Sequence, residues 1–235
     1  MKIKIDPTIF AKYPNVVLGV AAVAGVNNTG DNPEIQPLLR NAEQNAIEKI
    51  KDIPLVEHSH VFPWREAYRL FGAKPKKYPS SIENLLRRVS GGEQVRHINK
   101  LVDIYNIISL KHLVPVGGED LEKIEGNVLL TFAGDNEVSV KLLGEPEARP
   151  PYPDEVIYKD NAGTICRRWN WKEADRTKLT ESTKYAVIII EGLPPVGKKE
   201  IQEALNELYD LVTKFCGGQV VISVLDKDEQ ETTLK

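Results

Sequence analysis

The sequence predicts an α+β fold in which mixed β-sheets are flanked by helices. Apolar runs of strand length occur together with amphipathic runs of helical length, and no dinucleotide-type glycine loop is present. With 235 residues, 28% of them charged, the chain can bury a sizeable core and is neither disordered nor fibrous. We expect residues 1–235 to form a single unit, with any subdomain boundary near residues 145–154 and a charged, frayed tail at 226–235.

Residues 1–50 predict two strands followed by a helix. Lys2–Ile5 alternates like an edge strand, and Val16–Val26 forms a second, buried strand that ends in the turn-forming segment Asn27–Gly30. From Glu34 to Ile50 the apolar residues fall at helical spacing with charged residues between them.

His58 and His60 form an H-x-H pair ahead of the next helical pattern, Arg65–Phe71. A metal needs further ligands, and no third ligand is evident nearby. The same alternation fits a strand or loop, so we expect no metal site.

Basic residues are dense around a third predicted helix. Ser80 or Ser81 is its candidate N-cap, and Gly91-Gly92 is its stop. The densest positive stretch of the chain includes Lys76, Lys77, Arg87 and Arg88. A solvated helix face and a phosphate-contacting surface both explain this pattern. The net charge of −3 supplies no strong global attraction to nucleic acid.

The apolar run Leu101–Ile108 is interrupted by Asp103 and Asn106, three positions apart. A helix would put both side chains on one face. Inside an apolar run such residues are either tied into a hydrogen-bond network or aimed at a cavity.

These residues carry a resemblance to a known family. Ile98-Asn99, Leu101–Asp103 and Asn106 resemble the I-N-x-x-V-D-x-T-N run of the bacterial phenylalanyl-tRNA synthetase beta subunit, and Asp120–Gly126 resembles its D-L-x-K-I-x-G segment. In that family the run lies in the paired third and fourth (B3/B4) segments, which hydrolyse mischarged Tyr-tRNA. The resemblance extends from about Ser80 to about Ile201, and it implies a free-standing editing module without the ATP-binding core of a ligase.

Three positions depart from the family pattern or extend it. Gly117 stands where the family has a pocket histidine, Tyr105 replaces a threonine, and Lys100 falls where the family has a basic pocket residue. The resemblance therefore implies a reshaped pocket, and specificity for tyrosine does not carry over.

After Gly126, two strand-like runs, Val128–Phe132 and Val138–Leu142, are joined by a segment of hairpin-turn composition. Prolines between residues 146 and 153 make a stiff connector. Glu155–Asp160 then predicts a strand whose hairpin partner is Thr164–Arg168.

Two of the three tryptophans lie in the run 166–172. On a strand, Arg168, Asn170 and Lys172 would face one way while Trp169 and Trp171 face the other. The pair of tryptophans fits either a core flanked by surface residues or a pocket wall in which rings stack on a ligand. We favour the pocket wall, because its opposite face is rich in hydrogen-bond donors.

Tyr185–Ile190 predicts a central strand buried on both faces, and it ends at Glu191. A carboxylate at such a strand end is either a catalytic or ligand-binding acid or a structural ion-pair partner. The resemblance places Thr183 and Glu191 at the family's threonine and editing-pocket glutamate. An amphipathic helix, Lys198–Phe215, and a last strand, Val220–Leu225, complete the chain.

Composition also bears on the compartment. Cys166 and Cys216 lie far apart with no C-x-x-C or Cys/His cluster, so reduced thiols are expected. The longest apolar runs are too short to span a bilayer, and no signal-peptide pattern follows Met1. We therefore expect a cytoplasmic protein with no membrane partner.

The resemblance implies an aminoacyl-tRNA deacylase that acts in trans and uses neither a metal nor another cofactor. In this hypothesis Glu191 grips the substrate ammonium or orders the water, while Asn106 and Asn170 supply donors. The expected substrate-binding residues are Lys100, Asp103, Tyr105, Gly117, Arg168, Trp169, Trp171 and Thr183. Arg87, Arg88, Lys76 and Lys77 are expected to contact phosphates at the acceptor end of the aminoacylated tRNA.

The alternative hypothesis is a non-catalytic module that binds RNA, a free amino acid or a related small molecule. Gly117 in place of the pocket histidine is its best support. The two hypotheses differ in what Glu191→Ala should do: a deacylase loses turnover but keeps tRNA affinity, whereas a small-molecule binder loses ligand affinity.

Overall fold

The computed structural model describes residues 1–234 and centres on an antiparallel four-stranded sheet in the order β11-β2-β10-β3. Its strands are β2 (Val17–Ala24), β3 (Val116–Asp120), β10 (Tyr185–Gly192) and β11 (Gln219–Leu225). β10 lies inside this sheet and all its residues except Tyr185 are buried, as its continuous apolar run predicts.

A second sheet has six strands in the order β12-β1-β4-β7-β8-β9. Its strands are β1 (Lys2–Ile5), β4 (Val128–Phe132), β7 (Val156–Asp160), β8 (Gly163–Arg167), β9 (Lys172–Glu173) and β12 (Glu231–Thr233). β1 runs parallel to β4 while the other pairs are antiparallel, so the sheet is mixed. The predicted α+β class with mixed sheets is confirmed.

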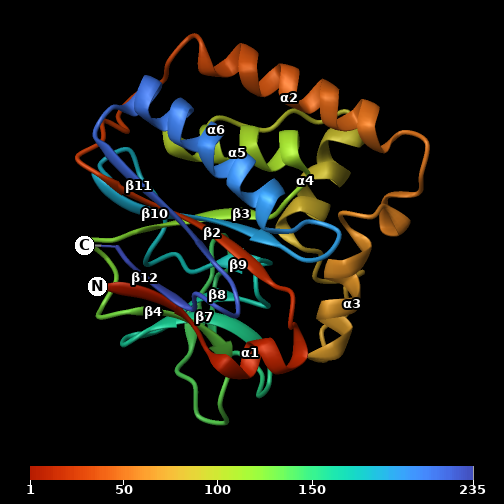
Figure 1. The fold of residues 1–235 in the computed structure, drawn as a ribbon, viewed down its shortest axis with the longest axis vertical. Helices are drawn as coiled ribbons and strands as arrows, with labels where there is room; N and C mark the ends of the chain where they lie inside the picture. Colours follow the sequence, from red (N-terminus) through yellow and green to blue (C-terminus); the bar gives the residue numbers. More distant parts are fainter. Residues whose placement is uncertain (235) are drawn as a thin grey trace.

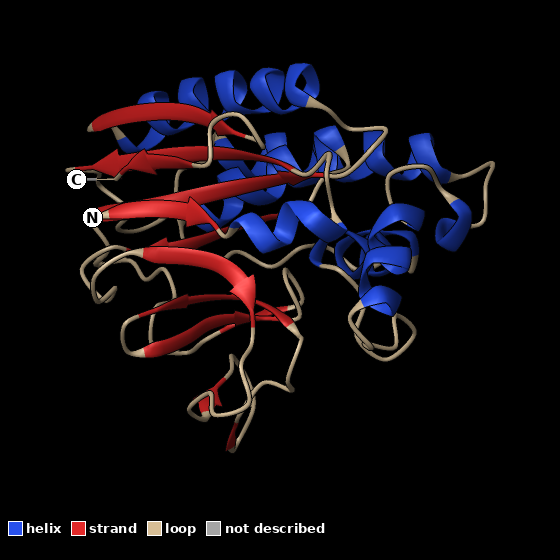
Figure 2. Cartoon of the chain, turned by 60° about the horizontal axis from the view of Figure 1, so that its bottom comes forward, coloured by secondary structure: helices blue, strands red, loops and turns tan. Residues whose placement is uncertain are grey.

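Helices cover the four-stranded sheet on the face away from the second sheet (Figures 1 and 2). α5 (Lys100–His112) and α6 (Lys198–Cys216) pack against its strands, and α2 (Ile35–Ile50) packs on α5. Gly19 in β2 permits the close approach of α6, because a Cβ there would lie 2.7 Å from Ile201 Cγ2.

The shorter helices lie toward one end of the sheets (Figure 1). They are α1 (Pro7–Lys12), the 3₁₀ helix η1 (Leu55–Glu57), α3 (Phe62–Leu70) and α4 (Ser81–Ser90). Polar caps define the two helices that line the site. Ser80 Oγ accepts from the Glu83 N–H at 3.4 Å at the start of α4, and Asn99 Oδ1 accepts from the Val102 N–H at 3.1 Å at the start of α5.

One apolar core joins the two sheets and the helices. It includes Ile3 and Leu130 of the second sheet, Leu18 and Ile188 of the four-stranded sheet, and Leu205 of α6. None of the helices within residues 1–234 is long and apolar enough to cross a membrane.

Three predictions about segments outside the site are wrong. Lys2–Ile5 is not an edge strand, because β12 pairs with its other side. The same pairing shows that residues 231–233 are not a frayed tail. Val128–Phe132 and Val138–Leu142 do not form a hairpin: β4 pairs with β1 and β7, while β5 (Val140–Lys141) pairs with β6 (Ala148–Arg149). Local turn composition does not determine which distant strand offers the better apolar partner.

Candidate functional site

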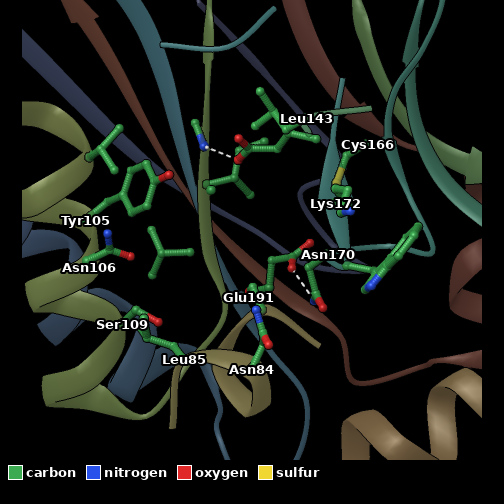
Figure 3. Close-up of a pocket in the computed structure, with 18 of the residues that line it drawn as sticks. Asn84, Leu85, Tyr105, Asn106, Ser109, Leu143, Cys166, Asn170, Lys172 and Glu191 are labelled. Atoms are coloured by element: carbon green, nitrogen blue, oxygen red, sulfur yellow. Dashed lines mark hydrogen bonds between the residues drawn. The ribbon is translucent and has the colours of Figure 1, made fainter. Parts of the chain in front are cut away.

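A cavity of about 470 Å³ opens where the two sheets meet α4 and α5 (Figure 3). Its walls come from β3 and β10 of the four-stranded sheet, from β7 to β9 of the second sheet, and from one face of each helix. The sequence-predicted residues that line it are Arg88, Tyr105, Asn106, Gly117, Trp169, Asn170, Trp171 and Glu191. Segments far apart in the sequence therefore build one hollow.

Glu191 sits near the end of β10 and is 3% exposed. Its Oε1 accepts a hydrogen bond from the Tyr158 hydroxyl, and its Oε2 accepts one from the Asn170 side-chain amide. Burial raises the pKa of the Glu191 carboxyl to about 7, although these two hydrogen bonds oppose the rise. Glu191 is therefore a carboxyl that changes charge near neutral pH.

The segment that carries Asn170 is a turn, so the predicted strand alternation across residues 166–172 is wrong. β8 ends at Arg167, and Arg168 and Trp169 have positive φ values of 49° and 66°. Both Arg168 and Trp169 are buried. Trp169 lies edge-on against the rings of Tyr13 and Trp64, at centroid distances of 4.7 Å and 5.1 Å. Packing of this ring beneath α3 overrides the local strand pattern.

The turn holds Asn170 in one orientation. Its Oδ1 accepts from the Tyr68 hydroxyl at 2.8 Å, and its main-chain oxygen accepts from the Ser81 N–H at 3.0 Å. Its Nδ2 donates to Glu191, so α3 and β10 meet at its side-chain amide while α4 is joined to its main-chain oxygen. Figure 3 shows Asn170 beside Glu191, with Tyr105 and Asn106 on the facing helix α5.

Arg168 is occupied by protein groups. Its guanidinium carbon lies 3.7 Å from the ring centroid of Tyr78 and 4.6 Å from that of Trp171. One of its nitrogens lies 3.9 Å from a carboxylate oxygen of Glu155. Glu155 also forms a buried bidentate pair with Arg167, with both N–O distances at 2.9 Å. In this structure Arg168 supports the pocket wall and does not line the cavity.

Two cavity carboxyls, Glu119 and Glu173, did not emerge from the sequence. Glu119 is 4% exposed on β3, and Glu173 lies on β9, where its Oε1 accepts from the Gly118 N–H at 3.2 Å. Burial and the neighbouring Glu173 charge hold the pKa of Glu119 well above its ordinary value, and burial raises the pKa of Glu173 to about 7. Their strands are short and lack an alternating apolar pattern. The sequence therefore contained no sign that these two glutamates would be buried in one cavity.

Glu173 lies against position 117, where the sequence resemblance would place a histidine. A Cβ at Gly117 would lie 2.8 Å from Glu173 Oε1. The carboxylate thus occupies space that a side chain at this position would need. An acid from the opposite sheet therefore borders Gly117.

Other predicted residues lie outside the cavity. Asp103 belongs to a polar network, with its Oδ2 2.6 Å from His97 Nδ1 and accepting from Gln36 Nε2 at 3.0 Å. Thr183 Oγ1 donates to the Asp120 carboxylate at 2.7 Å, and Lys100 is buried at the start of α5. Asp103 thus takes the network alternative expected for a polar residue in an apolar run, and Asn106 takes the cavity alternative.

Basic side chains gather at the cavity edge. Arg88, Arg96 and Lys172 line it, and Arg88 and Arg96 are exposed. Lys77 lies 5.2 Å from the ring centroid of Tyr78, which itself packs against Trp171. We call the three lining residues Arg88, Arg96 and Lys172 the basic edge; Lys172 also pairs with Glu145, and Arg88 lies 3.8 Å from Glu93. Lys76 is exposed beside Lys77 in sequence, and Arg87 pairs with Glu83.

Comparison with protein families gives a match to the B3/4 domain over residues 63–217. The chain belongs to the B3/4 domain family. The match confirms the resemblance to the phenylalanyl-tRNA synthetase beta-subunit B3/B4 domain that residues 98–126 indicate. It includes α3 to α6 and the strands from β3 to β10, and so every wall of the cavity.

A solved structure with a similar arrangement is an N-terminal fragment of the phenylalanyl-tRNA synthetase beta subunit from Pyrococcus horikoshii. It is 12% identical to this B3/4 domain protein, with a TM-score of 0.48. The alignment covers 93% of this chain and 49% of that one, so the chain spans about half of the fragment's length. Among curated proteins, no match is found.

Proposed function

We propose that this B3/4 domain protein hydrolyses the ester of a mischarged aminoacyl-tRNA, acting in trans and without a metal. The observation that carries the proposal is the polarity of the cavity, with buried carboxyls inside and the basic edge at its opening. An aminoacyl-tRNA end has the complementary polarity, because its ammonium group is positive and its phosphates are negative. Membership of the B3/4 family supports the same substrate class.

In the proposed mechanism Glu191 holds the α-ammonium group of the substrate. Tyr158 and Asn170 fix its carboxylate, so little reorganisation is needed when the substrate arrives. The side-chain amide of Asn106, which lines the cavity from α5, donates to the carbonyl oxygen as negative charge develops there.

A water molecule then adds to the ester carbonyl carbon. The vicinal hydroxyl of the terminal ribose assists by accepting a hydrogen bond from that water. The bond between the carbonyl carbon and the ribose oxygen breaks, and the proton lost by the water ends on that oxygen. Free amino acid and uncharged tRNA are the products.

Direct attack by water is consistent with the protonated state of Cys166, the thiol that lines the cavity. Cys166 is buried there, and burial holds its pKa well above the ordinary value. A protonated thiol is a poor nucleophile. Within residues 1–234 no group of three or more His, Cys, Asp or Glu side chains is placed to hold a metal ion.

We propose that tRNA approaches along the basic edge, with its acceptor end in the cavity. Arg88 and Arg96 are exposed and would neutralise backbone phosphates irrespective of sequence. We also propose that residues 1–235 act as a single unit, since one apolar core runs through both sheets.

The deciding experiment is release of amino acid from a panel of correctly and incorrectly charged tRNAs, with and without the protein. Accelerated release from a mischarged pair is expected, and it should survive a chelator. Glu191→Gln and Asn106→Ala should each lower the rate, whereas the matched change Glu203→Gln on the exposed face of α6 should not. Absence of release from every pair would refute the proposal.

One observation favours the alternative of a non-catalytic binding module. Glu173 fills the space beside Gly117, and no histidine is among the described residues that line the cavity. These residues thus supply carboxyls that can bind a cation but no imidazole to transfer a proton. Such a module would bind tRNA or an amino acid with no release of product. Binding of tRNA without hydrolysis of any charged pair would select this function.

A further inference from the structure

The cavity contains a carboxyl pair that the proposed mechanism does not use. Glu119 is 4% exposed, and its Oε2 accepts no hydrogen bond of normal geometry within residues 1–234. Burial raises the pKa of Glu119; the nearby Thr177 hydroxyl opposes this rise but is itself left unpaired within the same residues. Glu173 lies close enough that its charge raises the pKa of Glu119. A buried carboxyl oxygen without a partner costs free energy, and a donor supplied by a ligand removes that cost.

The basic side chains nearest in sequence are engaged elsewhere. Arg176 donates to both oxygens of Asp160, at 2.8 Å and 3.0 Å, and Lys178 pairs with Asp175 at 2.7 Å. Lys172 pairs with Glu145. In the described part of the chain, no lysine, arginine or histidine forms an ion pair with either carboxyl of the pair.

The pair also has a defined position relative to Glu191. In the β3–β10 register Glu119 is opposite Val187 and Gly117 is opposite Ile189, so Glu191 lies on the same face two residues beyond Ile189. Glu173 Oε1 lies over Gly117. Two strand residues span roughly 7 Å, so Glu173 stands about that far along the strand from Glu191, with Glu119 beyond it.

We propose that Glu119 and Glu173 form a subsite for a second ammonium group, so that the cavity takes the ester of an amino acid with a basic side chain. In lysine the two nitrogens are separated by six bonds of about 1.5 Å each, a span of roughly 7 Å when extended. One ammonium group reaches Glu191 while the other reaches Glu173. Ile189 and Ile165, which also line the cavity, contact the methylene groups between them.

This inference names the substrate class of the proposed function and rests on that function for the role of Glu191. It also predicts a change in the number of protons bound to the protein when the ligand binds. The raised pKa values mean that the empty cavity retains protons on this pair near neutral pH. A bound cation favours the ionised carboxylates, so binding releases protons.

The test compares L-lysinamide with L-norleucinamide, which have the same number of side-chain carbons and differ in the terminal ammonium group that only lysinamide carries. Their binding to the full chain is measured by calorimetry at about pH 7, where the ligand ammonium groups are charged and the pair keeps protons, in two buffers of different ionisation enthalpy. Lysinamide should bind at least about tenfold more tightly, as expected for a hydrogen-bonded charge, and should release protons.

Variants connect this preference to the pair. Glu119→Gln and Glu173→Gln should each lower the lysinamide preference toward unity, while Glu191→Gln weakens both amides by a similar factor. Glu203→Gln, an exposed glutamate on α6, is the matched control and should change neither affinity. Urea unfolding of each variant verifies that it folds.

Equal affinity for the two amides, no detectable binding of lysinamide, or a preference that survives both substitutions would overturn the inference. The charged-tRNA panel separates this failure from failure of the proposed function. Hydrolysis confined to esters of neutral amino acids retains the deacylase and removes the basic subsite. A lysinamide preference that depends on Glu119 and Glu173, without hydrolysis of any charged tRNA, retains the subsite and removes the deacylase.

Discussion

Replacing Glu191 by glutamine should flatten the dependence of folding stability on pH between about pH 5 and 7. The Glu191 carboxyl has a pKa of about 7 in the folded chain and an ordinary value of 4.5. As pH rises through this window the unfolded chain loses its proton first, while the folded chain keeps it. The folded state therefore binds more protons, and wild-type stability falls with rising pH.

The magnitude follows from the same two values. One pKa unit corresponds to about 1.4 kcal/mol, so full ionisation of Glu191 costs the folded state about 3 kcal/mol relative to the unfolded chain. Glutamine cannot ionise, so this loss disappears. The altered hydrogen bonds to Tyr158 and Asn170 add a constant cost that does not change with pH.

Urea unfolding at about pH 5, 6, 7 and 8 gives the free energy of unfolding for each protein. The wild-type curve should fall more steeply than the Glu191→Gln curve. Glu173→Gln should show the same flattening, because burial raises the pKa of Glu173 to about 7 as well. Glu203→Gln should run parallel to wild type. Parallel curves for wild type and Glu191→Gln would refute the conclusion that burial raises the pKa of the Glu191 carboxyl.

Three further predictions concern other parts of the molecule. Gly19→Ala should lower the free energy of unfolding by about 1–3 kcal/mol in urea titrations, because its Cβ would lie 2.7 Å from Ile201 Cγ2; an unchanged midpoint would show that α6 shifts freely. Glu155→Ala should cost about 3–5 kcal/mol in the same assay, since it leaves the buried Arg167 guanidinium unpaired, and a loss below about 1 kcal/mol would contradict this role. Arg88→Ala should weaken tRNA binding and lower the salt slope of log affinity by about one, measured by filter binding at several salt concentrations, with stability unchanged.

Local sequence patterns were enough to predict the elements whose burial follows a regular period. The continuous apolar runs of β2 and β10 predict buried strands, and the spacing of Ile201, Leu205 and Leu208 predicts α6. The cap at Ser80 and the resemblance around Asn106 were also readable, because caps and family motifs are contiguous in the chain.

The way in which these elements pair and pack depends on contacts between distant segments. The partner of β4 is β1, more than a hundred residues earlier in the chain, because both bury apolar side chains in the core that joins the sheets. The turn at Arg168 and Trp169 depends on ring packing against Tyr13 and Trp64, which no local pattern encodes.

The carboxyl pair shows the same limit within the site. Glu119 and Glu173 come from strands of different sheets, and each looks like an ordinary surface acid in the sequence. Burial raises the pKa of both carboxyls, and the Glu173 charge raises that of Glu119 further; both causes exist only after the sheets pack together. A chain encodes burial periods locally, whereas the electrostatics of a cavity depend on contacts between residues far apart in sequence.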